Sequence, residues 1–303
     1  MIPATKRKNA FHPEAETAAK KPAWLKVRLP SHQIFFQVRD ILKKHRLHTI
    51  CQSAKCPNIA ECWEQKTATF LILGDICTRH CTFCSVKKGI PAPSSLQEPF
   101  QVAEAVAAFG LRYAVITSVT RDDLADGGAS FFAETIRAIK MRSPETKVEV
   151  LIPDLKGEEE SVDAVVQAQP DVVSHNLETP EALYCEINRP LENYQRSLNV
   201  LKRAKEKGAI TKSGLMVGLG EKEEEILQTL SDLRQVSCDL LTIGQYLQPT
   251  SASVPVRRYY PPQEFEQLKI ISLDFGFKDV VAGPLVRSSY HASQLYQSLQ
   301  NMV

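Results

Sequence analysis

Residues 67–84, TATFLILGDICTRHCTFC, decide the fold. The stretch begins with an apolar, β-rich run at 67–73 and then carries three cysteines at CxxxCxxC spacing: Cys77, Cys81 and Cys84. Three thiolates on one short loop suit either zinc or an iron–sulfur cluster. We therefore expect a buried strand that leads directly into a metal-binding loop.

Further apolar runs follow this strand at regular spacing, with helical patterns between them. They are 113–119, 147–153, 171–176, 212–218 and 239–246. Strands that alternate with helices predict a parallel sheet, and strands that are apolar on both faces are typical of one. A GxGxxG motif does not follow the first strand, which disfavours a dinucleotide-binding fold. The pattern predicts an α/β fold, a partial (β/α)6 TIM-type barrel whose chemistry gathers at the C-terminal ends of the strands.

The expected organisation is a barrel with an extension at each end, packed as one unit. Residues 1–66 form the N-terminal extension, 67–250 the barrel and 251–303 the C-terminal extension. The chain of 303 residues has 43% hydrophobic and 24% charged residues, an ordinary globular composition. No apolar run approaches 18 residues and no signal-peptide core is visible, so we expect a cytoplasmic protein without a membrane partner.

The cysteines indicate metal rather than disulfides. Six of the eight fall between residues 51 and 84, and cytosolic thiols stay reduced. Cys185 and Cys238 stand alone in apolar contexts, where we expect plain buried thiols. A second triplet, Cys51, Cys56 and Cys62, precedes the first at CxxxxCxxxxxC spacing. Its cysteines lie farther apart than the pairs of a usual zinc knuckle.

Each triplet lacks a fourth ligand. A zinc ion bound by Cys77, Cys81 and Cys84 would need one, but the nearest candidate, His80, adjoins Cys81 and would strain the loop. A [4Fe–4S] cluster tolerates the vacancy because one iron can hold a substrate instead. The residues favour the cluster.

The charge is unevenly distributed along the chain. Residues 1–48 hold eleven Lys and Arg against three Asp and Glu, a net charge of +8, which leaves −6 for the remainder. Such a basic arm either binds an acidic partner or is a solvated terminus, and the sequence leaves both open. Stacking aromatics are not interleaved with the basic residues, so we expect no nucleic-acid partner.

The motif CTRHCTFC resembles the signature of the radical S-adenosylmethionine (SAM) superfamily, including Phe83 before the third cysteine. The two triplets, together with the C-terminal RSSY at 287–290, resemble the lipoyl synthase family specifically. Segments such as CPNIAECW, SVTRDDLADGGA and GPLVRSSYHA extend this resemblance through nearly the whole chain. Two positions depart from the family pattern: Thr120, where an acid is expected, and Asn188, where a valine usually precedes Arg189.

The resemblance implies two [4Fe–4S] clusters and SAM. The cluster on Cys77, Cys81 and Cys84 would take SAM as its missing ligand, and the resulting 5′-deoxyadenosyl radical would attack the substrate. The auxiliary cluster on Cys51, Cys56 and Cys62 would be the sulfur source, with Ser289 as its fourth ligand. Two serines that merely cap a helix at 291–302 are the alternative.

The resemblance also implies the substrate and partners. The substrate would be an octanoyl chain on a lipoyl carrier domain, of a 2-oxoacid dehydrogenase or the glycine cleavage H protein, with sulfur inserted at C6 and C8. A reductant such as ferredoxin or flavodoxin and a cluster-repair carrier would be partners. Biotin synthases and methylthiotransferases are rivals that lack the upstream triplet and RSSY. A zinc or nucleic-acid-binding module is a rival of another class.

Five residues are candidate SAM contacts: Gly127 and Gly128 in the turn after the second strand, Asn176 and Glu178 at the end of the fourth, and Arg189. The glycine pair could equally be a simple turn, and Arg189 a surface charge. His175 is expected to be a hydrogen-bonded core residue, and Glu221 an acid at a helix N-terminus.

Overall fold

The computed structural model describes residues 21–27, 33–45, 47–65 and 67–300. In this part of the chain one eight-stranded sheet has the order β1-β2-β5-β6-β7-β8-β9-β10. The strands are β1 (His48–Thr49), β2 (Thr69–Ile72), β5 (Tyr113–Ser118), β6 (Lys147–Leu151), β7 (Val172–Ser174), β8 (Thr211–Val217), β9 (Leu240–Gln245) and β10 (Asp279–Gly283). All neighbours pair in parallel except β1 and β2. The predicted α/β partial barrel is confirmed, and each expected strand is present.

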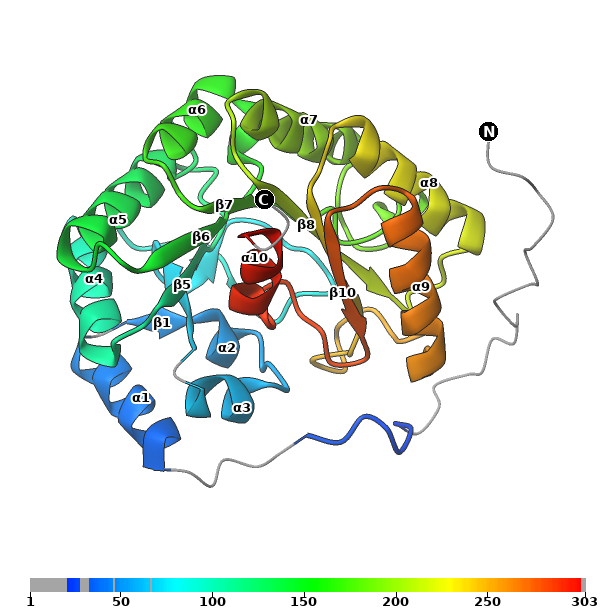
Figure 1. Ribbon diagram of the computed structural model, residues 1–303, viewed down its shortest axis with the longest axis horizontal. Helices are drawn as coiled ribbons and strands as arrows, with labels where there is room; N and C mark the ends of the chain where they lie inside the picture. The colour runs from blue at the N-terminus through cyan, green and yellow to red at the C-terminus, as the bar shows by residue number, and fades with distance from the viewer. Residues whose placement is uncertain (1–20, 28–32, 46, 66, 301–303) are drawn as a thin grey trace.

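Helices follow the strands and form an outer layer around the curved sheet (Figure 1). They are α4 (Glu98–Phe109), α5 (Ala129–Arg142), α6 (Glu159–Gln167), α7 (Glu192–Glu206) and α8 (Glu223–Gln235). Short 3-10 turns η1 (Leu155–Gly157) and η2 (Glu181–Leu183) lie between them. The helix α4 ends where Gly110 takes a left-handed φ of 61°, a conformation that costs glycine little.

The position of strand β2 inside the sheet explains why its sequence is apolar throughout. All four of its residues are buried, since it lies inside the sheet between β1 and β5. Beyond β2 the chain forms a small separate sheet from β3 (Ile76–Cys77) and β4 (Lys87–Lys88), which pair in parallel. The loop with the CxxxCxxC cysteines therefore lies between β3 and β4, at the C-terminal end of the barrel strands.

Both extensions contribute strands to the main sheet. The N-terminal one holds α1 (Gln33–Lys44), β1, α2 (Ile50–Ser53) and α3 (Ile59–Glu64), and β1 pairs with β2. The C-terminal one holds α9 (Pro262–Asp274), β10 and α10 (Ala292–Gln300). Strand β10 pairs with β9, a pairing that the expected six-stranded pattern did not include.

The helix α10 closes the end of the barrel opposite the cysteine loops. In Figure 1 it lies at the centre of the ring of strands, and it corresponds to the helix expected at 291–302. Tyr296 donates a hydrogen bond to Asp171, just before β7, and Ser298 donates one to Asp279, at the start of β10. These bonds hold α10 against the N-terminal ends of two strands from opposite parts of the sheet.

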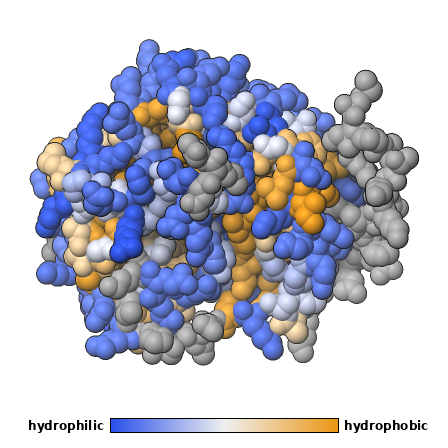
Figure 2. All heavy atoms as spheres, viewed as in Figure 1, coloured by the Kyte–Doolittle hydropathy of each residue, from blue (hydrophilic) through white to orange (hydrophobic). Residues whose placement is uncertain are grey.

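The face seen in Figure 2 is largely hydrophilic, with apolar atoms gathered over α9. Ile270 and Leu273 of this helix are 57% and 38% exposed. Among the described helices none has the length and apolar character needed to cross a bilayer.

The basic residues before position 49 are only partly described. Those that are described are exposed: Lys21, Lys26, Arg39, Lys43 and Lys44. The others lie outside the described residues: Lys6, Arg7, Lys8, Lys20, Arg28 and Arg46.

The two isolated cysteines differ in burial. Cys238 is fully buried, as expected, but the expectation for Cys185 is wrong because this thiol is exposed. Leu183, Tyr184 and Ile187 turn into the core at this short helical turn, which leaves Cys185 on the outside.

Candidate active site

The CxxxCxxC loop is held by backbone bonds to four other segments, one of them through the amide of Val254, which donates to the Thr82 carbonyl. The amide of Thr78 bonds to the Thr120 carbonyl after β5, and the amide of Thr82 bonds to the Ile187 carbonyl. Gly89, after β4, donates to the Cys77 carbonyl over 3.0 Å. The side chains of Cys77, Cys81 and Cys84 are half-buried, while His80 is exposed. The exposure of His80 gives no support to a zinc site completed by this residue.

Arg79 anchors the middle of the loop to the barrel. Its guanidinium forms two-pronged ion pairs with Asp122 and with Asp154, all at 2.7–2.9 Å. Asp154 is buried after β6, and although burial opposes ionisation, Arg79 lowers the pKa of this carboxyl to about 2. Paired guanidinium and carboxylate groups of this geometry are strong and directional. The loop therefore has a fixed position before any metal binds.

The predicted polar residues gather on the barrel side of this loop. Burial, together with the nearby Cys81, Cys77 and Glu178, raises the pKa of Cys84 to about 11. Arg189 lies close enough to Cys81 and Glu178 for both to favour its charged form. Its guanidinium also lies over the Tyr184 ring, 5.6 Å from the centroid. Arg189 is thus a half-buried cation that faces the cysteines, not a surface charge.

Asn176 and Glu178 follow β7. Asn176 donates to Glu178 over 3.3 Å and to the Ser288 hydroxyl over 2.7 Å. Gly214 of β8 makes room for Asn176, because a Cβ at this position would lie 2.7 Å from the Asn176 Oδ1 atom. Glu178 adopts a left-handed φ of 73°, and its carboxyl has a raised pKa because it is buried.

Several buried polar atoms near these residues have no hydrogen-bond partner. They include Asn176 Oδ1, Arg189 Nε and Arg189 Nη1, with Ser118 Oγ at the end of β5 and Ser174 Oγ at the end of β7. Buried polar groups are normally satisfied, so such a set suits a polar ligand. Sequence reasoning missed Ser118 and Ser174. The available signal was a serine at the last position of an otherwise apolar strand.

The glycine pair forms the turn between β5 and α5. Gly127 and Gly128 have left-handed φ values of 61° and 94°. A Cβ on Gly128 would lie 2.4 Å from the Leu73 side chain, and Asp126 accepts bonds from the amides of Gly128 and Ser130. This geometry accounts for both glycines as a tight turn against β2, and direct contact with SAM stays a prediction.

Two further residues at the strand ends have structural partners. His175 is buried, and its Nδ1 is 2.8 Å from the Ile152 carbonyl, which confirms the expected core residue. Glu221 does more than favour a helix end. Its carboxylate accepts bonds from the amides of Gly218 and Leu219, over 2.5 and 2.9 Å, and so fixes the turn after β8.

The second triplet comes together around α2 and α3. Cys51 lies in α2, Cys62 in α3 and Cys56 in the turn between them, where its amide bonds to the Cys51 carbonyl over 2.9 Å. Burial, with a smaller effect from the neighbouring thiols, raises the pKa of Cys51 to about 11 and that of Cys62 to about 12. These thiols share one buried site, where a cationic metal would favour their ionised forms.

The C-terminal RSSY segment lies against this triplet. Arg287 is close enough to Cys56 to oppose the rise in its pKa. The hydroxyl of Ser289 accepts a 2.8 Å bond from Thr69, which itself bonds to Cys51. Tyr290 donates to Glu61, next to Cys62, over 3.1 Å. Ser288 instead faces Asn176 in the barrel. Both serine hydroxyls are therefore engaged by side chains of the barrel, which removes the support for a role as helix caps.

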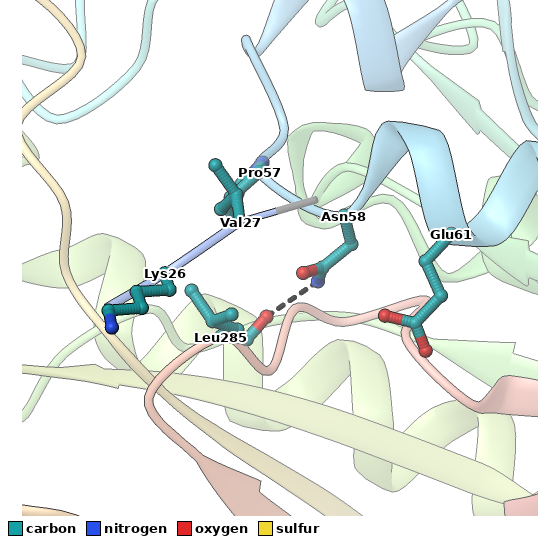
Figure 3. A pocket seen from close by; sticks show the side chains of 6 residues that line it. All are labelled: Lys26, Val27, Pro57, Asn58, Glu61 and Leu285. Atoms are coloured by element: carbon teal, nitrogen blue, oxygen red, sulfur yellow. Dashed lines mark hydrogen bonds between the residues drawn. The ribbon is translucent and has the colours of Figure 1, made fainter. Parts of the chain in front are cut away.

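A pocket of about 200 Å³ opens beside the second triplet. It is lined by Lys26, Val27, Pro57, Asn58, Glu61 and Leu285. In Figure 3 Asn58 reaches across to the Leu285 carbonyl, to which it donates over 2.6 Å. This bond joins the loop between Cys56 and Cys62 to the segment that precedes RSSY.

The donor chemistry of both triplets fits iron–sulfur clusters. A zinc ion draws its sulfur ligands to about 2.3 Å, whereas a four-iron cluster has a separate iron for each thiolate. Within the described ranges, no three His, Cys, Asp or Glu side chains converge on a single-ion site. The barrel residues also fit SAM, because Arg189 and Asn176 offer unpaired donors and an acceptor toward the first triplet.

Comparisons with known proteins agree with this geometry. Residues 71–233 match the family model "Radical SAM superfamily". A lipoyl synthase of Caldicellulosiruptor bescii is 56% identical over 93% of this chain and 98% of its own length. One of Chlorobaculum tepidum is 54% identical over 90% and 94%. Among solved structures, methylornithine synthase matches with a TM-score of 0.53 at 13% identity, covering 82% of each chain.

The fold and the first cysteine triplet define a radical SAM enzyme, and the chain belongs to that superfamily. Such enzymes use a [4Fe–4S] cluster and SAM. The similarity to the two relatives above spans both triplets and nearly the whole chain. Within the superfamily, the chain belongs to the lipoyl synthase family and is a radical SAM sulfurtransferase.

Burial of His175 makes stability depend on pH. Burial lowers its pKa from 6.5 to about 4, so the unfolded chain takes up a proton that the folded chain refuses. The free energy of unfolding should fall by about 3 kcal/mol from this group as the pH drops from 6.5 to 4.

Urea unfolding at several pH values tests this expectation. The variant His175→Asn can keep the bond to Ile152 and should flatten the dependence. His48→Asn, at an exposed position, is the matched control and should not. An equally steep fall in His175→Asn would contradict the expectation.

Proposed function

We propose that this chain inserts two sulfur atoms, at C6 and C8 of an octanoyl chain carried on a lysine of a lipoyl carrier domain. The substrate follows from the family name of its relatives. An unactivated methylene offers neither an acidic proton nor an electrophilic carbon, so acid–base and nucleophilic catalysis cannot open it. The bound cluster and SAM would supply a primary carbon radical that can abstract its hydrogen.

The observation that carries the proposal is the pair Ser288 and Ser289. Ser288 bonds to Asn176, among the residues that face the first triplet, and Ser289 bonds to Thr69, beside the second. The two serines are the central residues of a turn in which the amide of Tyr290 bonds to the Arg287 carbonyl over 2.9 Å, and their hydroxyls bond to different barrel segments. The two cysteine sites are therefore separated by a single dipeptide, which supports transfer of sulfur between them over a short distance.

The chain's own residues would hold SAM at the barrel mouth. The Arg189 guanidinium suits the SAM carboxylate, and Asn176 and Glu178 suit hydroxyl groups of its ribose. Burial of these groups would exclude water from a reactive radical.

The second triplet and Ser289 would hold an auxiliary [4Fe–4S] cluster that serves as the sulfur substrate. An alkoxide is a harder ligand than a thiolate and suits iron–sulfur chemistry less well, so it leaves more readily. Arg287, which lies beside Cys56, would stabilise negative charge there. A reductant protein and a cluster-repair carrier complete the proposed partners, and the cytoplasm is the proposed location because the clustered thiols need a reducing compartment.

An anaerobic assay tests the proposed function. The enzyme with both clusters is mixed with SAM, a reductant and an octanoylated lipoyl-domain peptide, and the peptide is followed by mass. We expect the gain of two sulfur atoms with two SAM molecules cleaved. SAM cleavage without any sulfur-containing product would overturn the proposal.

Ser289 provides a sharper expectation. Ser289→Ala should still assemble the auxiliary cluster but lower sulfur insertion at least about 100-fold, since even outer partners of metal ligands are worth 10- to 100-fold. Ser289→Cys should hold the cluster more firmly and resist its opening. Mössbauer spectra and product mass measure the two effects.

Ser288→Ala is the matched control, because it removes the neighbouring hydroxyl and the bond to Asn176. It should weaken SAM binding and leave the auxiliary iron signal as in the parent. Full turnover in Ser289→Ala, with loss of auxiliary iron only in Ser288→Ala, would move the ligand role to Ser288.

A further inference from the structure

The loop between β4 and α4 exposes apolar side chains beside the first cysteine triplet. This 87–97 loop, KKGIPAPSSLQ, contains Ile90 and Leu96, which are 94% and 77% exposed. Phe100, 47% exposed, continues the apolar surface onto the first turn of α4. Two exposed lysines, Lys87 and Lys88, stand at one end, and the loop itself contains no acidic residue.

The loop is bonded directly to the cysteines. In the β3–β4 pair Lys88 lies opposite Cys77, and Gly89 donates to the Cys77 carbonyl over 3.0 Å. The ammonium of Lys88 donates to the Cys81 carbonyl over 2.9 Å. At the other end, Arg121 donates to the Ser94 hydroxyl over 2.7 Å. The apolar side chains thus belong to a loop that is itself hydrogen-bonded to the backbone of Cys77 and Cys81.

We propose that the 87–97 loop docks a small acidic electron-carrier protein. The inference rests on the proposed function, which needs one electron for each SAM cleaved. Complexes for electron transfer have small interfaces and short lifetimes, and a few exposed apolar residues rimmed by charge suit them. Lys88 gives the rim a positive charge that attracts an acidic partner, whereas the charge of Lys87 is balanced by its ion pair with Asp75.

The position of the patch favours an electron carrier over the octanoylated domain. The apolar surface runs from the loop onto the first turn of α4, a helix of the outer layer that lies outside the ring of strands (Figure 1). A carrier domain must insert its acyl-lysine between the two triplets, whereas an electron donor needs only to approach the outside of one. In the step proposed, the docked protein would be oxidised by one electron, and an iron–sulfur group held by Cys77, Cys81 and Cys84 would accept that electron, with no atom or proton transferred.

The experiment compares two reductants on the enzyme with both clusters. Ile90→Asp and Leu96→Asp each place a negative charge on the patch. With a limiting acidic flavodoxin as donor, we expect the initial rate of SAM cleavage to fall about tenfold in each variant, the loss that one interface anchor carries. With dithionite, a small molecule that needs no docking surface, the rates should equal those of the parent.

Met141→Asp is the matched control, because Met141 is 81% exposed near the end of α5 and lies outside the patch. It should behave as the parent with both reductants. Flavodoxin binding, measured by interferometry at rising salt, should weaken in the two loop variants and weaken with salt in the parent.

Each other outcome has a distinct meaning. Equal flavodoxin-driven rates in all variants would overturn the docking surface, as would a loss seen equally with dithionite. Weaker binding of the octanoylated lipoyl domain, with flavodoxin binding intact, would assign the patch to that partner and overturn the proposal. A parent enzyme that cannot cleave SAM even with dithionite would refute the proposed function, while the binding measurement would still test the docking surface.

Discussion

Replacing Cys77, Cys81 and Cys84 together by alanine will abolish SAM cleavage and remove about four of about eight irons from each chain. These thiols lie on one loop, and Cys84 is affected by the charges of the other two. With every ligand of this cluster gone, nothing remains to bind or reduce SAM, so the rate should fall at least about 1,000-fold. Iron analysis and release of 5′-deoxyadenosine under dithionite measure both effects.

The chain offers matched controls for this variant. Cys185→Ala and Cys238→Ala remove one exposed and one buried thiol outside both triplets. Both should keep their full iron content and SAM cleavage. A triple variant that still cleaves SAM, or that retains all its iron, would show that the first triplet is not the SAM cluster.

Replacing Cys51, Cys56 and Cys62 by alanine will separate the two chemical steps. SAM cleavage should continue, because Arg79 and the bonds to Thr120 and Ile187 fix the first cysteine loop to the barrel, and the side-chain bond to α2, from Ser85 to the Ser53 carbonyl, does not involve a cysteine. Lipoyl product should fall below detection, since the proposed sulfur source is gone. Product mass and 5′-deoxyadenosine are measured in the same reaction.

The melting temperature shows whether variants of the second triplet still fold. Cys51 is buried, and its replacement by alanine opens only a small space, so the melting temperature should fall by a few degrees at most, as for about 1 kcal/mol. Cys62→Ser, at a half-buried position, provides a milder variant if the triple one unfolds. Lipoyl product from the triple variant would refute the assignment of the auxiliary cluster as sulfur donor.

Hydrogen bonds from Ser288 and Ser289 link the two cysteine sites that the two triple variants remove. Asn176 follows β7 and bonds to Ser288, whereas Thr69 begins β2 and bonds to Ser289. Movement of the RSSY segment would therefore change both cysteine sites together. Its downstream helix, α10, is fixed at the far end of the barrel by Tyr296 and Ser298, which limits that movement to the segment itself.

Much of the fold follows from local patterns. Each predicted strand appears, because a buried parallel strand needs a short apolar run and the helices between need a 3.6-residue period. The pattern failed at β10, whose run DVVAG is short and partly exposed at the end of the sheet. It also failed for Cys185, since an apolar neighbourhood in sequence does not say which side of a single helical turn faces the core.

The sequence by itself identified both cysteine triplets, because thiols a few residues apart on one segment can converge on one site. It also located Asn176 and Glu178 after the end of a strand, where a barrel gathers its chemistry, and singled out Arg189 farther along the chain. Only the tertiary structure decided that Arg79 clamps the loop to Asp122 and Asp154, and that Ser118 and Ser174 have buried hydroxyls without partners.

The direction in which each serine of RSSY points was likewise decided by tertiary structure. Ser289 and Thr69 are 220 positions apart, and Asn58 and Leu285 are 227 apart. Such contacts depend on how β10 joins β9 and how α10 closes the barrel, which the residues around the serines do not encode. The spacing of cysteines along the chain determines what one segment can bind, whereas the packing of distant segments determines which of them lie together at one site.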